Sequence, residues 1–552
     1  MAIKYSKLIS DENRLRINTI NRWIQIKLPV QFLKQEAILV IIIISSFILL
    51  LITSFLITDN NDNQLDIFYS SNYAVIVDCG SSGSRAHIFT WPKNISQQEL
   101  PSHIVLLKDE ITGKSLTKHV TPGLSSFHSE PEKASDYMEP IMKFISDKVP
   151  STRHLDTPIY FMATAGLRML DETTQKRILN DITRDLRNKF NFPRIKGQVI
   201  TGQFEGIYAC ISLNVDRIFG KLDRVIMEQN GINNRSLGII EMGGASLQVV
   251  YELMPETENN ILSRLKDNDA IKTFRTEQTK LYSIGNHSVK LFATTFLGLG
   301  VNSAREYAID LLVRDYLIGI GELGKSRNEN EVKDFEVRLK DPCLTEGSSE
   351  IVLRPIEVAT DIKRSIGFTA LNNNKDQLFK VRLEGSGNFL NCLDLLERVI
   401  QQIKSSKLNC LASNNRKSCP ASLLGESFIP FDHHQFIGLS ELFFTTNEMM
   451  NLSGPFVMSQ FLHESKKICE SNYNKLIDKY SKESSITHAD RILYECFKAS
   501  WILTVMHNNG LSVPSDYKYL RTIERLDGRE VDWTLGALLS EMILNNRNLE
   551  NH

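Results

Sequence analysis

A carboxylate followed at once by a glycine- and serine-rich turn stands near residue 78. Five apolar residues, 73–77, run into Asp78, and Gly80, Ser81, Ser82, Gly83 and Ser84 follow before apolar residues resume. Glycine lets the backbone approach phosphate oxygens, while backbone N–H groups and serine hydroxyls donate hydrogen bonds to them. A buried hairpin turn that happens to contain an aspartate is the alternative. The pattern favours a site for phosphate together with its metal cation.

The same arrangement recurs 163 residues later. An apolar stretch ends at Glu241, and Gly243, Gly244, Ala245 and Ser246 precede a second apolar stretch. The spacing is one domain length. Two like lobes, each presenting an acidic phosphate loop to a cleft between them, describe the actin-like ATPase architecture. We therefore expect an α/β protein with a duplicated, ribonuclease H-like fold. An N-terminal transmembrane helix is expected from a separate stretch of the sequence, residues 37–57.

Two further segments lie between the loops, and together the four suggest a family. Residues 159–170 form an apolar stretch that breaks at Thr164-Ala-Gly, and residues 199–209 form another that breaks near Glu205. In this order the four segments resemble the apyrase motifs of the nucleoside triphosphate diphosphohydrolase family, closest to its Golgi and lysosomal members. The resemblance covers residues 73–539. It includes later landmarks at 294–300, 341–344, 385–389, 436–441 and 531–537.

Hydrolysis of a phosphoanhydride needs a positioned water, a base for its proton and positive charge near the phosphate. The resemblance makes Glu205 the general base, although a glutamate favoured by the helix macrodipole is the simpler interpretation. It also implies that Ser246 and Gln248 position the water, whereas Gln248 could instead be an exposed strand residue. The chain is thus expected to be an enzyme, an apyrase or nucleoside diphosphatase.

The predicted phosphate ligands are the backbone N–H groups of residues 80–84 and 243–245. Hydroxyls of Ser81, Ser82, Ser84 and Thr164 add donors, while Arg85 and Arg168 either bind phosphate or form structural ion pairs. The family stacks the nucleobase on an aromatic ring of the second lobe. Phe436, Phe443 and Phe444 lie in the matching region, with the protein core as their alternative place.

The expected cofactor is Mg²⁺ or Ca²⁺, hard cations that take carboxylate partners and keep water ligands. Asp78 and Glu241 would flank the cation, chiefly through coordinated water. Glu241 departs from the family, which ordinarily has aspartate there, and one methylene adds about 1.5 Å of reach. Because Ca²⁺ sites tolerate this better than Mg²⁺ sites, we expect activity with an adapted site; impaired activity is the alternative.

Residues 37–57 form an uncharged stretch rich in Ile and Leu, preceded by seven basic and three acidic residues in segment 1–36. At 1.5 Å per residue the stretch spans about 30 Å, the thickness of the bilayer core. It is too long for a cleaved signal peptide, which is the alternative. The positive-inside rule then predicts a single-pass type II membrane protein with a cytosolic N-terminus and a lumenal or extracellular remainder.

The expected domains follow from these features. They are a cytosolic segment 1–36, a transmembrane helix 37–57, a stalk 58–72, a first lobe comprising 73–202 and 512–546, and a second lobe 203–511. The net charge is −1 for 552 residues, and the first 36 residues contribute +4. This balance argues against a general nucleic-acid surface. A nucleotide substrate and the membrane are the expected partners, and oligomeric state is left open.

Eight cysteines and four glycosylation sequons suit an oxidising compartment. Cys79 and Cys210 fall inside motif elements and are expected to be free and buried. Six later cysteines allow 15 pairings, and clustered cysteines could also bind metal, but no C-x2-C spacing occurs. The family resemblance implies Cys343–Cys392, Cys410–Cys419 and Cys469–Cys496. The sequons are Asn94, Asn234, Asn286 and Asn451.

The function expected from the resemblance is cation-dependent hydrolysis of nucleoside tri- and diphosphates by activated water. UDP or GDP in the lumen of the Golgi or another secretory or endolysosomal compartment is the favoured substrate. A cell-surface enzyme that hydrolyses ATP and ADP is one alternative. A catalytically weak nucleotide-binding protein is another, and Glu241 is its main support.

Overall fold

The computed structural model of the chain describes residues 45–46 and most of 71–550. The gaps within 71–550 are 97–98, 110, 220–235, 266–267, 285–286, 323–335, 356–377, 413–428, 432–433, 481–488, 508–509 and 527–528. The predicted segments 1–36, 37–57 and 58–72 therefore lie almost wholly outside the described residues. Among the helices that are described, none is both long and apolar enough to cross a bilayer. Residues 71–552 form one compact unit.

The first half of this unit is built on a mixed sheet in the order β3-β2-β1-β5-β6. β1 and β2 form an antiparallel hairpin, and β5 and β6 add in parallel on the other side of β1. β4 pairs with β2. The strands are β1 (Ser71–Cys79), β2 (Ser84–Pro92), β3 (Val105–Leu106), β4 (Thr117–Val120), β5 (Ile159–Ala163) and β6 (Ile195–Val199).

A second sheet repeats this topology. Its strands β10-β8-β7-β14-β16 have the same hairpin at β7–β8 and the same two parallel additions, and β9 and β15 extend its edges. The bounds are β7 (Gly238–Met242), β8 (Ser246–Glu252), β9 (Thr279–Ile284), β10 (His287–Leu297), β14 (Phe436–Ser440), β15 (Gly454–Pro455) and β16 (Leu520–Thr522). The predicted α/β class with an internal duplication is thus confirmed at the level of topology.

The strand β16 corrects one predicted boundary. Sequence placed all of 512–546 with the first lobe, but β16 pairs in parallel with β14 and is the fifth strand of the second sheet. The chain passes to the first lobe only after this strand. The short hairpin β17 (Arg525–Leu526) and β18 (Arg529–Glu530) follows, and then α18 (Thr534–Glu550).

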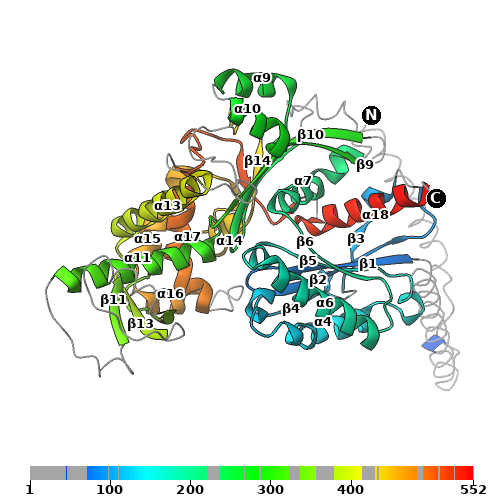
Figure 1. Cartoon of the computed structure of the whole chain (residues 1–552), viewed down its shortest axis with the longest axis horizontal. Coiled ribbons are helices and arrows are strands. Elements are labelled where there is room, and N and C mark those ends of the chain that lie inside the picture. The colour runs from blue at the N-terminus through cyan, green and yellow to red at the C-terminus, as the bar shows by residue number, and fades with distance from the viewer. Residues whose placement is uncertain are drawn as a thin grey trace, which may run out of the picture. The chain divides into compact units, whose positions relative to one another are not determined.

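Two helices lie between the sheets and join the lobes. α7 (Gly202–Phe219) packs on β8 and β10 of the second sheet, and α18 packs on α7 and on β1 of the first (Figure 1). Their apolar residues share one buried core with both sheets, which includes Ile76, Ile207, Ile239 and Leu538. Burial of this continuous apolar surface ties the two lobes together.

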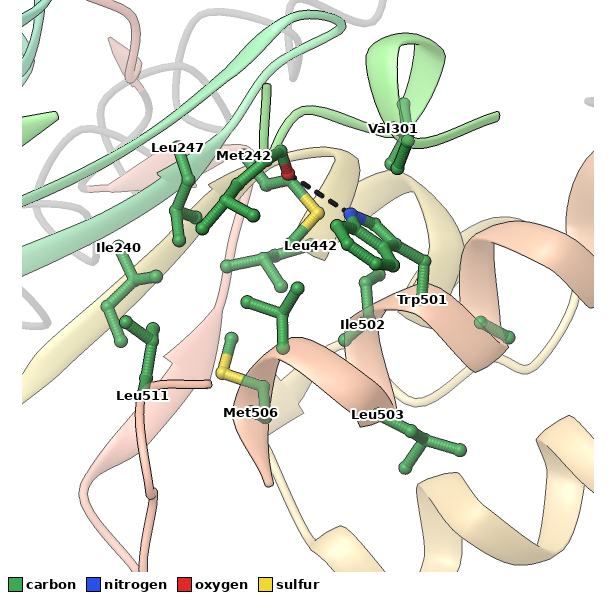
Figure 2. Close-up of a cluster of buried hydrophobic side chains, with 14 of the residues drawn as sticks. Ile240, Met242, Leu247, Val301, Leu442, Trp501, Ile502, Leu503, Met506 and Leu511 are labelled. Carbon is green, nitrogen blue, oxygen red and sulfur yellow. Dashed lines mark hydrogen bonds between the residues drawn. The ribbon is translucent and has the colours of Figure 1, made fainter. Parts of the chain in front are cut away.

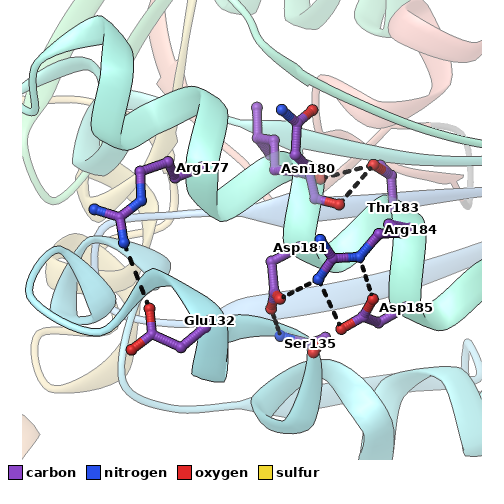
Figure 3. A network of polar contacts seen from close by, with 9 residues as sticks. Glu132, Ser135, Arg177, Asn180, Asp181, Thr183, Arg184 and Asp185 are labelled. Carbon is purple, nitrogen blue, oxygen red and sulfur yellow. Dashed lines mark hydrogen bonds and ion pairs between the residues drawn. The ribbon is translucent and has the colours of Figure 1, made fainter.

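The helices α4 (Ala134–Lys148) and α6 (Glu172–Lys189) pack against each other on the first sheet. Asp171 caps α6 by accepting from the Thr174 N–H at 3.0 Å. The buried Asp181 carboxylate of α6 accepts from the Ser135 N–H at 2.9 Å, which ties the start of α4 to α6 (Figure 3). The small helices α3 (Leu100–His103) and α5 (Ala165–Arg168) complete this lobe.

The second lobe carries a helical core next to its sheet. Trp501 is fully buried and donates from its indole nitrogen to the Leu299 carbonyl at 3.0 Å, within the cluster that contains Met242 and Leu442 (Figure 2). The helices are α9 (Pro255–Arg264), α10 (Asn268–Thr273), α11 (Val301–Glu322), α13 (Phe389–Ala412), α14 (Glu441–Glu448), α15 (Met458–Cys469), α16 (Tyr473–Tyr480) and α17 (Ala489–Met506). A three-stranded sheet consists of β11 (Glu336–Asp341), β12 (Ser349–Pro355) and β13 (Leu378–Gly385).

Two of the three predicted disulfides, Cys343–Cys392 and Cys469–Cys496, are present. The third, Cys410–Cys419, lies outside the residues whose side chains are described. Cys79 and Cys210 are free and buried as predicted. Of the sequon asparagines, Asn94 and Asn451 are exposed, while Asn234 and Asn286 lie outside the described residues.

Candidate active site

Two loops with the same hydrogen-bonding pattern form the centre of the site. The Gly80 N–H donates to the Gly83 carbonyl at 2.9 Å and closes the turn between β1 and β2. The Gly243 N–H donates to the Ser246 carbonyl at 2.9 Å and closes the turn between β7 and β8. Both N–H groups are used inside their turns. Contrary to the prediction, Gly80 and Gly243 therefore do not offer backbone donors to phosphate.

Other backbone donors of the loops are placed to bind an anion. The carbonyl of Gly243 accepts from the Val301 N–H at 3.0 Å, and that of Gly244 accepts from the Asn302 N–H at 2.7 Å. The start of α11 thus binds the carbonyl groups of the second loop. In the described part of the chain, five loop N–H groups donate to no protein atom, namely those of Ser81, Ser82, Gly83, Gly244 and Ala245. A run of such donors is a phosphate cradle.

The two loops meet at Ser81. A methyl group on Gly244 would stand 2.6 Å from the Ser81 hydroxyl oxygen and 2.7 Å from the Asn302 amide nitrogen. A methyl group on Gly166, in the Thr164-Ala-Gly segment, would stand 2.9 Å from the Ser81 Cα. Both separations are closer than real Cβ contacts: at Gly166 a backbone atom would have to move, and at Gly244 the side chains of Ser81 and Asn302 would have to move. Three of the four motifs predicted from the sequence therefore converge on one point.

The third predicted side-chain donor, Ser84, is fully buried beside Cys79, its partner across the hairpin. Its hydroxyl is closed off from solvent, unlike those of the half-buried Ser81 and exposed Ser82. Thr164 is buried, and its N–H donates to the Cys79 carbonyl at 3.2 Å at the start of α5. Arg85 is exposed. The structure thus places Ser81 and Ser82, more than Ser84, at the opening of the first loop.

Glu205 lies in the first turn of α7 and is buried, with 9% of its surface exposed. Its carboxylate forms an ion pair with Arg168, which α5 supplies from the first lobe. This is the structural alternative that the sequence left open for Arg168. Burial raises the pKa of Glu205, and the Arg168 guanidinium opposes that rise. The pair places a partly neutralised carboxylate beside the two loops.

The residues predicted to position water lie against Glu205. The Gln248 amide nitrogen is 3.4 Å from a Glu205 carboxylate oxygen and 2.6 Å from the Ser246 hydroxyl oxygen. Gln248 is 1% exposed, so the alternative of an exposed strand residue is wrong. Sequence reasoning missed Thr295, the partner of Gln248 across β8 and β10, whose hydroxyl oxygen is 3.4 Å from the same amide nitrogen. Its only signal was membership of the 294–300 landmark.

Two acidic side chains at equivalent places in the loops retain oxygens without a partner. In the strand pairing of the two hairpins, Asp78 lies opposite Arg85 and Glu241 lies opposite Gln248. Each of the two acidic residues precedes the glycine that closes its turn by two positions. One buried oxygen of each carboxylate, Asp78 Oδ1 and Glu241 Oε2, has no hydrogen-bond partner in the described chain. Burial raises the pKa of Asp78 to about 8, helped by the nearby negative charges of Glu205 and Asp532.

The pKa of Glu241 is also raised well above its usual value, first by burial and then by the charge of Glu205. Unpartnered carboxylate oxygens that repel one another fit a divalent cation. The described residues contain no group of three His, Cys, Asp or Glu side chains arranged to ligate a metal directly. The two buried carboxylates, each with an unpartnered oxygen, are the donors that the structure offers to such a cation.

Asp532 and Trp533 belong to the site although only the 531–537 landmark contained them. The Trp533 side chain hydrogen-bonds to Asp78. One Asp532 oxygen caps α18 by accepting from the Thr534 N–H at 2.8 Å, and the other is 3.2 Å from the His87 Nδ1. The contacts of Asp532 with His87 and of Trp533 with Asp78 join residues far apart in the sequence, so sequence spacing does not report them.

The aromatic residues proposed for base stacking divide into two groups. Phe436 is fully buried in the second sheet, with its ring 5.6 Å from Phe431 and 6.0 Å from Tyr251 between centroids. The base-binding prediction is wrong for Phe436, because its strand position points into the core. Phe443 and Phe444 are half-buried on α14, edge to face at 5.7 Å. Both keep surface that a nucleobase could cover.

Comparisons with known proteins agree with this geometry. A model of the GDA1/CD39 (nucleoside phosphatase) family matches residues 67–551. The human ectonucleoside triphosphate diphosphohydrolase 7 is 31% identical over 499 residues, which cover 87% of this chain and 74% of that protein. The Golgi apyrase of Saccharomyces cerevisiae is 27% identical over 491 residues, covering 85% and 70% respectively.

Among solved structures, a nucleoside triphosphate hydrolase from Neospora caninum is similar in fold. The TM-score is 0.52 at 14% identity, with coverage of 90% of this chain and 97% of that one. At this identity the likeness concerns the fold alone.

Proposed function

The chain belongs to the GDA1/CD39 (nucleoside phosphatase) family, and from that premise we propose that it hydrolyses nucleoside tri- and diphosphates. The products are orthophosphate and, in the end, nucleoside monophosphate. The observation that carries the proposal is the contact of Glu205 with Gln248 next to Ser246, beside two loops with unused backbone donors. A base, water-orienting groups and anion donors are the parts that this reaction needs.

In the proposed mechanism a water molecule attacks the terminal phosphorus directly. Gln248 and Ser246 orient the water, and Glu205 accepts its proton. The N–H groups of Ser81, Ser82, Gly244 and Ala245 bind the phosphate oxygens and stabilise the charge that accumulates on them. Arg168 holds the Glu205 carboxylate in place and opposes the rise in its pKa that burial causes.

We further propose Ca²⁺ or Mg²⁺ as the cofactor, held by Asp78 and Glu241 chiefly through water. The unpartnered oxygens Asp78 Oδ1 and Glu241 Oε2 support this assignment. When bound, the cation supplies positive charge to the substrate phosphates and compensates the carboxylate cluster. The nucleobase is assigned to the exposed surface of the half-buried Phe443 and Phe444.

The proposed location is the lumen of the secretory pathway, with residues 37–57 as a single-pass type II anchor. Two disulfides support an oxidising compartment. Relatives named Golgi apyrase, in Saccharomyces cerevisiae, and nucleoside-diphosphatase mig-23, in Caenorhabditis briggsae, support a nucleoside diphosphate as the substrate, and we favour UDP or GDP. Relatives named ectonucleoside triphosphate diphosphohydrolase make a cell-surface enzyme for ATP and ADP the second candidate.

The test is orthophosphate release by the purified full-length chain from UDP, GDP, ADP, UTP and ATP, with Ca²⁺, Mg²⁺ or chelator. We expect release that needs a divalent cation and is fastest with UDP or GDP. Preference for ATP and ADP would favour the cell-surface role. Nucleotide binding without phosphate release would overturn the assignment as a hydrolase and leave a nucleotide-binding protein.

A further inference from the structure

Ser440 has a backbone conformation that serine rarely adopts. It ends β14 and directly precedes α14, with φ 58° and ψ −123°. These angles are those of the first central residue of a type II′ turn, a position that glycine normally occupies because a Cβ is disfavoured there. Strained residues persist only where the surrounding structure fixes them, and they gather at functional sites. The Ser440 side chain is therefore a candidate for a functional contact.

The surroundings of Ser440 fix its backbone from both sides. β14 is paired in parallel with β7, so that Ser440 stands beside Met242. Glu441, which follows Ser440 directly, forms an ion pair with Lys498 of α17 at 2.9 Å. Leu442 comes next and is buried in the cluster that also contains Met242 (Figure 2). The chain reverses between a paired strand and an anchored helix, and the strain falls on Ser440.

The strained turn aims the Ser440 hydroxyl at the second phosphate loop. It donates to Oε1 of Glu241 at 3.1 Å, across 199 residues of sequence. Glu241 is 7% exposed, and its other oxygen, Oε2, has no partner in the described chain. One oxygen of the carboxylate is thus fixed by Ser440, and this fixes the direction in which the other one faces.

The internal duplication explains why such a contact is needed. The first loop has an aspartate, Asp78, at the place where the second has Glu241. The glutamate is longer by about 1.5 Å and has one more rotatable bond. A longer side chain loses more conformational freedom when it is held in one position, so it needs an additional contact to be held there.

We propose that Ser440 is a positioning residue matched to Glu241. It holds the longer carboxylate so that Oε2 faces the proposed site of the cation and its water ligands. This inference rests on the cation site of the proposed function. It adds a role for Ser440, which lies in the turn that leads into α14. It also explains how glutamate serves where the first loop uses aspartate.

The test is a double-mutant cycle of Ser440→Ala and Glu241→Asp in the full-length chain. The readout is the Ca²⁺ concentration that gives half of the maximal Ca²⁺-induced rise in the thermal unfolding midpoint. This readout needs no turnover, so it is separate from hydrolysis. We expect Ser440→Ala to raise that concentration about tenfold, the usual effect of losing a hydrogen bond to a charged group.

In the Glu241→Asp background, the shorter carboxylate no longer reaches Ser440, so Ser440→Ala should change the half-saturating concentration less than about twofold. An equal change in both backgrounds would overturn the proposal, because Ser440 would then act independently of Glu241. Absence of any Ca²⁺ or Mg²⁺ effect on unfolding of the wild-type chain would overturn it as well.

Ser440→Gly separates the hydroxyl from the strain, because glycine accepts the backbone angles without a hydroxyl. We expect it to weaken Ca²⁺ binding as Ser440→Ala does, while raising the thermal midpoint in chelator. Normal Ca²⁺ binding by Ser440→Gly would show that the hydroxyl is not needed. If the wild-type chain releases no phosphate but the double-mutant cycle gives the expected Ca²⁺ result, the proposed function is overturned and the coupling of Ser440 to Glu241 is retained.

Discussion

Arg168 forms a buried ion pair with Glu205, the residue that we propose as the general base. The two side chains are 14% and 11% exposed and come from different lobes, since α5 supplies the arginine and α7 the glutamate. A methyl group on Gly202 would overlap the Arg168 guanidinium, so the absence of a side chain there makes room for it. The pair opposes the rise in the pKa of Glu205 that burial causes.

The first prediction concerns the pH dependence of phosphate release. Arg168→Met removes the charge that lowers the pKa of Glu205, so the base becomes protonated at higher pH. The acidic limb of the kcat profile should move to higher pH by about one unit or more. Arg168→Lys keeps the charge and should keep the limb near its wild-type position. If the acidic limb does not move in Arg168→Met, Arg168 does not control the pKa of the general base.

The second prediction concerns the close approach of the first loop to the Thr164-Ala-Gly segment. Gly166→Ala places a methyl group 2.9 Å from the Ser81 Cα, a backbone atom that cannot rotate away, and should displace the first loop from that segment. We expect a loss of about 10²-fold in kcat/KM, because misplacement of about 1 Å has that effect. Gly243→Ala is the matched control, since the nearest atom to its methyl group is the Ser246 carbonyl oxygen at 3.7 Å. Equal losses in both variants would contradict the account.

The third prediction concerns stability without the cation. Burial, Glu205 and Asp532 raise the pKa of Asp78 from 3.8 to about 8. The stabilising contribution of such a group is complete below pH 4 and is lost as the pH rises through 8. In chelator, the thermal midpoint of the wild-type chain should therefore fall across this range, and Asp78→Asn should reduce the fall.

The same variant should have the opposite effect when the cation is present. Asp78→Asn removes a carboxylate oxygen from the proposed cation site, so it should lose most of the stabilisation by Ca²⁺ and most of the activity. The two midpoint curves should cross between chelator and saturating Ca²⁺. A variant that is less stable than the wild type in chelator at pH 8 would contradict the assignment of Asp78 as a repelled, buried carboxylate.

The local motifs allowed much of the site to be predicted. An apolar strand, a carboxylate and a glycine turn each constrain their neighbours in sequence, so both loops and the helix start at Glu205 could be recognised. The repeat of the first loop in the second indicated the duplicated topology. The resemblance to the family pointed to Ser246 and Gln248, and the structure brings them to Glu205.

Contacts across long sequence separations could not be predicted. Whether Arg168 meets phosphate or a carboxylate depends on which lobe packs beside α5. Phe436 looks like a platform for a base until its strand is placed inside the second sheet. The Ser440–Glu241 contact depends on a backbone angle of one residue. The role of β16 follows from its pairing with β14, since three residues carry too little pattern to assign a strand.

The most direct test of the central claim follows oxygen from water into the products, with Glu205→Gln beside the wild type. Glu172→Gln is the matched control, because Glu172 also lies in the first turn of an 18-residue helix but is exposed. Hydrolysis of UDP in ¹⁸O-labelled water should place the label in orthophosphate and leave UMP unlabelled. Glu205→Gln should slow release by about 10²- to 10⁴-fold while UDP still binds, and Glu172→Gln should match the wild type. Label in UMP, or wild-type rates in Glu205→Gln, would contradict attack on the terminal phosphorus by a water that Glu205 activates.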